Sequence, residues 1–373
     1  MAEPVIDVHP PLSPSVARRP RLRCLPFPLE DPRTRIYRQA RQGLWWGLKG
    51  LGLGSGDEVL APAYHHGSEI EVLARTGARC RFYDVGATFE PDESELDALL
   101  TDDVRALYLV HPFGFAAASH RWRRWCDERG LLLLEDGAQA WLSTDDDEPV
   151  GLHADLALFC LYEAFGLPDG GAVCSRAFAG PLPEAERTRA GAVVRLLASW
   201  AAQRSARAAA IVASVTADHD ARELPEVDFA LGAVDERPAR ATTLLLDRVV
   251  DLEAPRRRRA HFGFLARTLP DLRPPAFSDL PAGSSPLVFP IQVDDKPAVV
   301  ERLRRSGIAG TAVWRVPHPL LPVGECPGAD ELRERLVGLP VHHDLRPEDM
   351  VRIAGAVRSA TSQATAPTAA VSS

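Results

Sequence analysis

Residues Ala106–Gly137 decide the fold class of this chain, and they read ALYLVHPFGFAAASHRWRRWCDERGLLLLEDG. The stretch begins and ends with strand-length, mainly apolar runs, Ala106–Phe113 and Leu131–Gly137. Strands that are apolar on both faces are typical of a parallel sheet covered by helices. A helical pattern at Arg121–Arg129 lies between the two runs, so the stretch forms a strand–helix–strand unit. It predicts an α/β fold with a mainly parallel sheet flanked by helices.

The same alternation extends in both directions from this unit. Further strands are predicted at Glu58–Tyr64, Ala78–Val85, Leu156–Tyr162 and Gly171–Ser175, and further helices at Ser68–Arg75 and Glu93–Leu100. The Ala-rich stretch 187–215 has a helical pattern. A long helix interrupted at Pro255 follows Ala241, and then a strand at Pro286–Val293, a helix at Lys296–Ser306 and a closing helix after Arg346.

These patterns divide the chain into four parts. Residues 1–29 are rich in Pro and Arg without periodicity, which predicts a disordered or extended arm. Residues 30–240 are expected to form a large α/β domain, and residues 241–358 a smaller C-terminal α+β domain. Residues 359–373 are expected to be a disordered tail.

Composition excludes several classes of protein. The 373 residues carry a net charge of −8, so no basic field favours nucleic acid as a partner. No apolar run is long enough to span a membrane, and the N-terminus lacks the apolar segment of a secretory signal. Six cysteines without CxxC spacing fit reduced thiols, so we expect a cytoplasmic protein. Only two lysines are present, Lys49 and Lys296.

Sites in open α/β sheets form beyond the carboxyl ends of the strands. Polar residues follow four of the predicted strands at such positions. They are His65 and His66, then His111 to Gly114, then Asp136 and Gln139, and finally Glu163 to Gly171.

These strand-end segments resemble the DegT/StrS family of sugar aminotransferases, a branch of the fold-type-I pyridoxal-phosphate (PLP) enzymes. The resemblance covers about residues 33–358 and is carried by five segments in order. They are Leu51–Pro62 (LGLGSGDEVLAP), Val110–Gly114 (VHPFG), Leu134–Gln139 (LEDGAQ), Phe159–Ala172 (FCLYEAFGLPDGGA) and Leu339–Leu345 (LPVHHDL).

The resemblance implies a PLP-transferase fold, a nucleotide-linked sugar as the small-molecule substrate, and a role in secondary metabolism or polysaccharide biosynthesis. It also implies a homodimer, or a heterodimer with an active paralogue, because sites of this fold are usually built at a two-fold interface. Nucleic acid and membrane are not expected as partners.

Glu163 departs from the family pattern at the centre of the chemistry. It stands where the family has the lysine that forms a Schiff base with the cofactor. A carboxylate cannot form an imine, so ordinary Schiff-base transamination is disfavoured. Neither Lys49 nor Lys296 follows a strand near Asp136 in the sequence, so neither is expected to replace the missing amine.

The other family positions imply a non-covalent site for PLP or pyridoxamine phosphate (PMP). Asp136 matches the acid that pairs with the pyridine nitrogen, Gln139 the residue beside the ring, and His66 the ring that stacks on it. Asp136 could also be a buried acid bonded to backbone amides, and Gln139 a polar group at a helix start.

The resemblance also implies residues for the phosphate and for the substrate. Arg41 is expected to bind the phosphate at a helix start, although a solvated helix residue is an equal alternative. Gly170 and Gly171 match the glycines of the Schiff-base segment. Trp314, Arg315 and His318 resemble the small-domain loop near the substrate, or they simply pack against the large domain.

Other chemistries find little support. Adjacent histidines on a strand point to opposite faces, which argues against a metal site at His65–His66 or at His342–His343–Asp344. No pair of His or Cys residues has zinc-site spacing either, so we expect no metal site. The chain also lacks a G-x-S-x-G elbow and a G-x-G-x-x-G fingerprint after a strand.

Three hypotheses remain open. The first is a lysine-independent PLP or PMP enzyme, of a dehydratase-like kind that the resemblance implies, in which Glu163, His65 or His66 transfers the proton. The second is a non-catalytic homologue that stabilises or regulates an active aminotransferase. The third is a cofactor-free enzyme that uses the same residues as acid and base.

Overall fold

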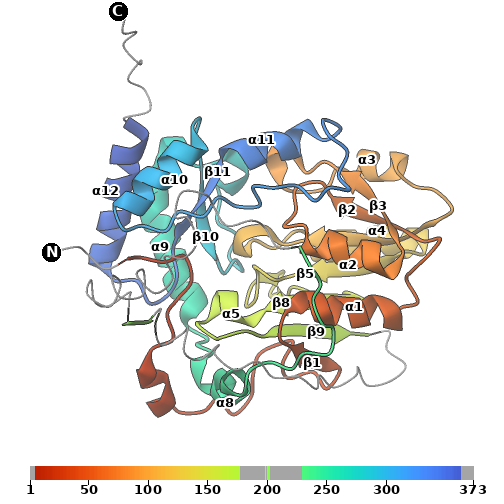
Figure 1. Cartoon of the computed structure of the whole chain (residues 1–373), viewed down its shortest axis with the longest axis horizontal. Helices are drawn as coiled ribbons and strands as arrows, with labels where there is room; N and C mark the ends of the chain where they lie inside the picture. The colour runs from red at the N-terminus through yellow and green to blue at the C-terminus, as the bar shows by residue number, and fades with distance from the viewer. Residues whose placement is uncertain (1–4, 177–197, 199, 202–228, 363–373) are drawn as a thin grey trace, which may run out of the picture.

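The computed structural model describes residues 5–176, 198, 200–201 and 229–362 (Figure 1). Most of the Ala-rich stretch 187–215, for which the sequence predicts a helix, therefore lies outside the described residues. None of the described helices is both long and apolar enough to cross a membrane.

A seven-stranded sheet forms the centre of the fold, and its strands run in the order β1-β9-β8-β5-β4-β2-β3. Their bounds are β1 Thr34–Tyr37, β2 Glu58–Pro62, β3 Arg79–Tyr83, β4 Val104–Val110, β5 Leu132–Asp136, β8 Leu156–Cys160 and β9 Gly171–Ser175. Strands β3, β2, β4, β5 and β8 pair in parallel, whereas β9 and β1 add antiparallel to one edge. The predicted α/β fold with a mainly parallel sheet is confirmed.

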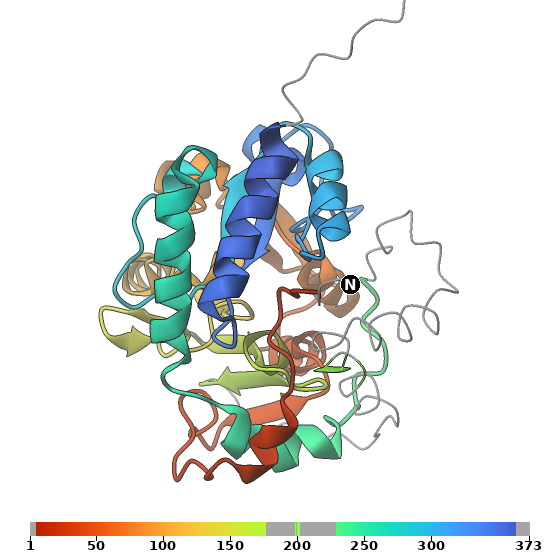
Figure 2. The same cartoon turned by 90° about the vertical axis from the view of Figure 1, so that its left-hand side faces the viewer.

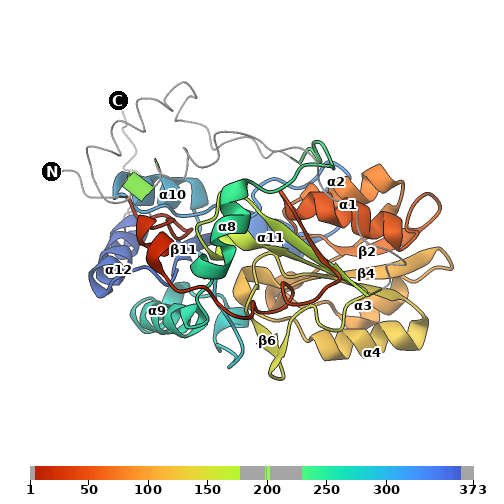
Figure 3. The ribbon, with the colours of Figure 1, turned by 90° about the horizontal axis from the view of Figure 1, so that it is seen from below.

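Helices cover both faces of this sheet (Figure 3). Helices α1 (Ala40–Gly50) and α2 (Ser68–Thr76) lie on one face, and α3 (Glu93–Ala98) and α4 (Ser119–Arg129) on the other. Side chains alternate accordingly: Tyr108 and Leu134 pack in a cluster with Leu44 of α1, whereas Leu107 and Leu133 pack in another with Trp122 of α4. This period of two decides which strand-end residues face which helix layer.

The C-terminal elements build a second unit around a two-stranded antiparallel sheet. They are α8 (Arg240–Val249), α9 (Ala254–Thr268), β10 (Val288–Gln292), α10 (Lys296–Arg305), α11 (Pro327–Arg335), β11 (Leu336–Pro340) and α12 (Pro347–Ser362). The long helices α9 and α12 lie side by side (Figure 2). The helix expected from Ala241 is two helices, because Pro255 starts α9 rather than interrupting it.

Short elements complete the described chain. They are the 3₁₀ helices η1 (Pro14–Arg18), η2 (Gly86–Thr88), η3 (Pro112–Gly114), η4 (Pro270–Leu272) and η5 (Pro275–Phe277), the single turn α5 (Leu161–Ala164), and the hairpin of β6 (Thr144–Asp145) and β7 (Glu148–Pro149).

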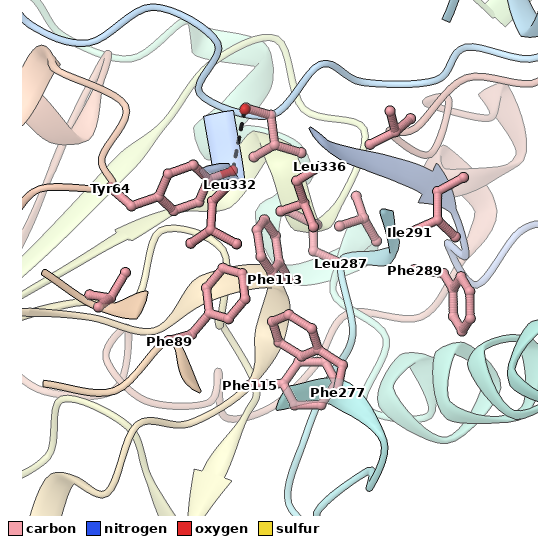
Figure 4. Packing of buried hydrophobic residues seen from close by; sticks show 14 of the residues in the cluster. Tyr64, Phe89, Phe113, Phe115, Phe277, Leu287, Phe289, Ile291, Leu332 and Leu336 are labelled. Carbon is pink, nitrogen blue, oxygen red and sulfur yellow. Dashed lines mark hydrogen bonds between the residues drawn. The ribbon is translucent and has the colours of Figure 1, made fainter. Parts of the chain in front are cut away.

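An aromatic cluster joins the central sheet to the C-terminal unit (Figure 4). Phe113 packs edge-on against Phe89 and Phe277, with ring centroids 5.7 and 5.4 Å apart. Tyr64 donates a 3.3 Å hydrogen bond to the carbonyl of Val313. Buried residues therefore continue from the sheet into the C-terminal unit, which fixes the loop that carries Trp314 next to the strand ends.

Both ends of the described chain are more structured than the sequence predicts. The N-terminal residues 5–29 contribute buried Ile6, Val16 and Phe27, and Ile6 pairs with Ile308 as an isolated bridge. Isolated apolar residues can be buried one at a time by neighbouring elements, which leaves no periodic signal in the sequence. At the other end α12 continues to Ser362, so residues 359–362 are helical rather than part of a disordered tail.

Candidate functional site

One pocket of about 110 Å³ lies where β4, β5 and β8 end beneath the starts of α1 and α2. The strand residues that line it point to the same face of the sheet as Tyr108 and Leu134, because side chains alternate along a strand. The pocket therefore lies on the face that α1 and α2 cover. Its lining consists of Gln39, Ala40, Arg41, Leu44, His66, Ser68, Glu69, Tyr108, Val110, Asp136, Ala138, Gln139, Leu158, Cys160, Tyr162, Glu163 and Trp314.

Asp136 is the last residue of β5 and points into this pocket. One carboxylate oxygen accepts a 2.7 Å hydrogen bond from the Tyr108 hydroxyl, and the other accepts a 2.9 Å bond from the Ala138 amide. Burial, followed by the charge of Glu69, raises the pKa of Asp136 to about 6. Asp136 is therefore mostly ionised at neutral pH, with its oxygens held in place by two donors.

Glu163 lies in the single turn α5 directly after β8 and lines the same pocket. Burial, followed by the nearby charge of Asp136, raises the pKa of Glu163 to about 8. At neutral pH it therefore carries a proton while Asp136 does not. The pocket holds one carboxylate and one carboxylic acid, which is the pairing that acid–base chemistry requires.

Neither lysine of the chain is among the lining residues. Lys49 is in the last turn of α1, with its ammonium 5.1 Å from the centre of the Trp45 ring. Lys296 is buried in the C-terminal unit, where its ammonium donates to the carbonyls of Val313 and Arg333 at 3.4 and 2.8 Å. The pocket therefore contains no amine side chain in the part of the chain that the structure describes.

The start of α1 forms one end of the pocket through Ala40 and Arg41. The Gln42 amide in this first turn already donates a 3.2 Å hydrogen bond to the Gln39 carbonyl. The start of a helix carries a partial positive charge, so this end still suits an anion. The Arg41 guanidinium donates a 2.9 Å hydrogen bond to the carbonyl of Ala230 and keeps a positive charge at the pocket wall. A Cβ atom on Gly171 would lie 2.0 Å from the Ala40 nitrogen, so this glycine permits the close approach of α1 to β9.

His66 and Trp314 form further walls of the pocket. Burial, followed by the charge of Arg41, lowers the pKa of His66 to about 4, so its ring is neutral at physiological pH. Its Nδ1 atom is buried and has no hydrogen-bond partner among the described residues. Trp314 packs face to face with Phe113 at 5.9 Å and has a φ of 42°, a strained angle for an aromatic residue.

Gln139 lines the pocket, but its side-chain oxygen accepts a 3.0 Å hydrogen bond from the Phe113 amide. It thereby holds the turn after β4 in place. Its side-chain amide group remains the part able to meet a ligand.

Five residues that the sequence singled out lie outside the lining, namely His65, Gly170, Gly171, Arg315 and His318. His65 is buried and bonded to the carbonyl of Pro62 at 2.8 Å, and it accepts a 3.3 Å bond from the His318 amide. His318 is itself buried, and its Nε2 atom lies 3.2 Å from Oε2 of Glu71 in α2. Arg315 is exposed, and Gly170 turns the chain with a φ of 123°.

Several lining residues were not predicted from the sequence. Glu69 accepts hydrogen bonds from the amides of His66 and Gly67, at 3.0 and 3.1 Å, at the start of α2. Tyr108 donates to Asp136, and Cys160 and Tyr162 flank Glu163. The alternation of β4 could have identified Tyr108, because residues two positions apart face the same helix layer. No local pattern distinguishes Glu69 from an ordinary acid in a first helical turn.

Together these residues suit a ligand with two unlike ends. Asp136 can pair with a basic ring nitrogen, and the α1 start with Arg41 can bind an anionic group. Residues 39–177, which include this pocket apart from Trp314, match the model of the DegT/DnrJ/EryC1/StrS aminotransferase family. Over these residues the chain is similar to this aminotransferase family.

Individual relatives extend the similarity along the chain. A UDP-N-acetyl-3-dehydro-alpha-D-glucosamine 3-aminotransferase of Acidithiobacillus ferrooxidans is 27% identical over 325 residues, which cover 83% of this chain and 79% of that protein. The crystal structure of the aminotransferase TlmJ from Streptoalloteichus hindustanus is 26% identical with a TM-score of 0.65, over 90% of this chain and 87% of that one.

A more distant structure shows the same fold. Spr1654 of Streptococcus pneumoniae, in its PMP form, is 18% identical with a TM-score of 0.64, over 96% of this chain and 98% of that one. The chain is thus a sugar aminotransferase-like protein with the fold-type-I architecture, as the sequence predicts.

Proposed function

We propose that this chain is a lysine-independent enzyme that binds PMP or PLP non-covalently and acts on a keto or amino sugar linked to a nucleotide. One observation carries the proposal. The pocket combines an ionised Asp136 with a proton-bearing Glu163, and its described lining contains no lysine. The sugar substrate is proposed by analogy with the aminotransferase relatives.

The described residues fit such a cofactor at three points. The Asp136 carboxylate would pair with the pyridine nitrogen, and the first amides of α1 with Arg41 would bind the phosphate. The Nδ1 atom of His66, which has no hydrogen-bond partner among the described residues, belongs to the pocket lining and would offer a polar group to the bound ring or its substituents. When bound, the cofactor supplies an electron-withdrawing ring and an exchangeable nitrogen group.

Glu163 takes the proton-transfer role that an amine has in lysine-bearing relatives. Its carboxyl oxygen holds a proton at neutral pH, so it can donate to a leaving oxygen or nitrogen and later recover a proton. The neutral His66 is the second candidate for this step because it lines the same pocket. Trp314 helps to exclude water from the pocket by stacking on Phe113.

The experiment compares three variants loaded with PMP or PLP and mixed with nucleotide-linked keto or amino sugars. Glu163→Gln should abolish sugar conversion, which chromatography of the products measures. Its cofactor affinity should change by less than about threefold. Asp136→Asn should weaken cofactor binding by at least about tenfold, because a neutral amide cannot keep the ring nitrogen protonated. Glu93→Gln removes an exposed charge outside the pocket and serves as the control.

Two results would oppose the proposal. Conversion that survives in Glu163→Gln would assign the proton transfer to another group. Cofactor binding without conversion of any tested sugar would favour a non-catalytic homologue that pairs with an active paralogue. We also propose that the protein works as a dimer, which light scattering of the full chain would test.

A further inference from the structure

Two histidines and a glutamate converge at the edge of the molecule, away from the pocket. They are His120 in the first turn of α4, Glu148 at the start of β7, and His153 in the turn that follows. One ligand atom from each of the three lies within 4.8 Å of the other two. Figure 3 shows the hairpin of β6 and β7 on the side of the sheet that carries α4.

Both imidazoles approach the same carboxylate oxygen. The Nε2 atom of His153 is 2.7 Å from Oε2 of Glu148, and the Nε2 atom of His120 is 3.1 Å from it. The two rings lie 4.7 Å apart, centre to centre. Ligand atoms around a tetrahedral zinc ion are separated by roughly 3.3 Å when the metal–ligand distances are about 2.0–2.2 Å. The two histidine–glutamate separations therefore lie within about 0.6 Å of the spacing around a zinc ion.

The local backbone holds these three groups together. Asp146 and Asp147 have φ values of 49° and 65°, the positive angles of a tight two-residue hairpin turn. This turn places Glu148 opposite Asp145. A carboxylate oxygen of Asp145 accepts a 3.3 Å hydrogen bond from the His120 amide, which ties the start of α4 to the hairpin.

We propose that His120, Glu148 and His153 form a binding site for a divalent transition-metal ion of the zinc type. Two imidazoles and one carboxylate suit Zn²⁺, Ni²⁺ or Cu²⁺, whereas Mg²⁺ and Ca²⁺ prefer ligand sets made of oxygen. The side chains are 29–46% exposed, so water can occupy the remaining coordination position. No spacing in the sequence indicates the site, because the ligands come from a helix and a hairpin separated along the chain.

The position of the hairpin gives such an ion a structural role. The Thr144 amide of β6 donates a 2.9 Å hydrogen bond to the carbonyl of Gly283, and the Ser285 amide donates a 3.0 Å bond to the Ser143 hydroxyl. The hairpin thus contacts the loop that precedes β10. An ion bound by these three side chains would fasten α4 to the hairpin, which in turn is bonded to this loop.

The test measures Zn²⁺ binding to the full chain after treatment with a chelator, by competition with a chromogenic chelator and without added cofactor. The wild type should bind one equivalent of Zn²⁺ with strong preference over Mg²⁺. Glu148→Gln and His120→Gln should each weaken binding by at least about tenfold, since each removes a ligand. Zn²⁺ should raise the Tm of the wild type but not of these two variants.

Asp146→Asn is the matched control, because it removes one negative charge from the same hairpin without removing a ligand. Asparagine also tolerates the positive φ of this position. The control should bind Zn²⁺ within about threefold of the wild type. Equal losses in Asp146→Asn and Glu148→Gln would show diffuse attraction to an acidic hairpin and overturn the site. Binding that persists in both ligand variants, or none in the wild type, would overturn it as well.

Discussion

Asp136 and Glu163 are two acids in one pocket with opposite protonation states. The Tyr108 hydroxyl and the Ala138 amide hold Asp136 and favour its ionised form, although burial raises its pKa to about 6. Glu163 is buried beside that charge, so its pKa rises further, to about 8. This difference in pKa supports the roles proposed above, with Asp136 as the charged partner of a ring nitrogen and Glu163 as the proton donor.

This difference predicts how stability depends on pH. The native state holds a proton on Glu163 that the unfolded state releases between pH 4.5 and about 8, so this group makes folding less favourable as pH rises through that window. Glu163→Gln removes the effect. Its stability relative to the wild type should therefore increase by at least about 1 kcal/mol from about pH 5 to about pH 8.5, measured by urea unfolding.

Glu93→Gln is the control for this measurement, because Glu93 is an exposed acid at the start of α3. Its stability relative to the wild type should change little over the same pH range. If Glu163→Gln behaved in the same way, Glu163 would titrate as an ordinary surface acid. It would then carry no proton at neutral pH, and the proposed proton transfer would lose its basis.

At the scale of elements, the start of α1 depends on the glycine that opens β9. A Cβ atom on Gly171 would lie 2.0 Å from the Ala40 nitrogen and 2.3 Å from the Gln39 carbonyl carbon. Both atoms belong to the backbone, so no flexible side chain can move aside. This contact fixes how far the first amides of α1 reach into the pocket.

Gly171→Ala should therefore lower the free energy of unfolding by about 1–3 kcal/mol and weaken cofactor binding, because the start of α1 must shift. Gly355→Ala is the comparison, since a Cβ atom there meets nothing within 4 Å in the middle of α12. It should stabilise the protein by about 0.5–1 kcal/mol. Thermal unfolding and PMP titration give both quantities. An unchanged PMP affinity in Gly171→Ala would show that the start of α1 does not contribute to cofactor binding.

The sequence predicts the elements that have a strong periodic pattern and misses those that depend on distant partners. The central strands and α2 to α4 appear close to their expected bounds, because each is buried on regular faces. Strand β1 has only four residues and forms by pairing with β9 at the sheet edge. The hairpin of β6 and β7 depends on two acidic residues with positive φ, which the sequence analysis did not interpret as a turn.

The same distinction applies to the candidate site. The rule that sites lie beyond strand ends selects Asp136, Gln139 and Glu163, and the structure places all three in one pocket with His66. The rule cannot tell which of two adjacent histidines faces the pocket, because this depends on how the chain turns after β2. It also cannot identify the close contact of Gly171 with Ala40, which joins segments far apart in the sequence.

At the scale of the whole molecule, the N-terminal segment connects the two units. Ile6 pairs with Ile308 in the C-terminal unit. Further along, Pro10 and Leu12 lie so close to Gly166 that a Cβ atom there would be 2.5 Å from their backbone atoms. Gly166 follows Glu163 by three residues, so the segment covers the chain that carries the proposed proton donor.

Deletion of residues 1–12 should make the segment after Glu163 open more often to solvent. Hydrogen exchange at residues 164–169 should become at least about tenfold faster, because the covering backbone is gone. Deletion of residues 1–4 alone leaves these contacts in place and is the control. Equal exchange in the two deletions would show that the segment covers the site without stabilising it.

The central claim is that the pocket binds its cofactor without a covalent bond to lysine. The most direct test is a titration of the full chain with PLP and with PMP, in which absorption spectra report binding. The titrated protein is then reduced with borohydride, and its intact mass is measured. We expect saturable binding of cofactor that Asp136→Asn weakens, with no mass increase after reduction. A cofactor adduct that appears after reduction and maps to Lys49 or Lys296 would contradict it, as would the absence of binding at about millimolar cofactor, which corresponds to a binding free energy weaker than about −4 kcal/mol.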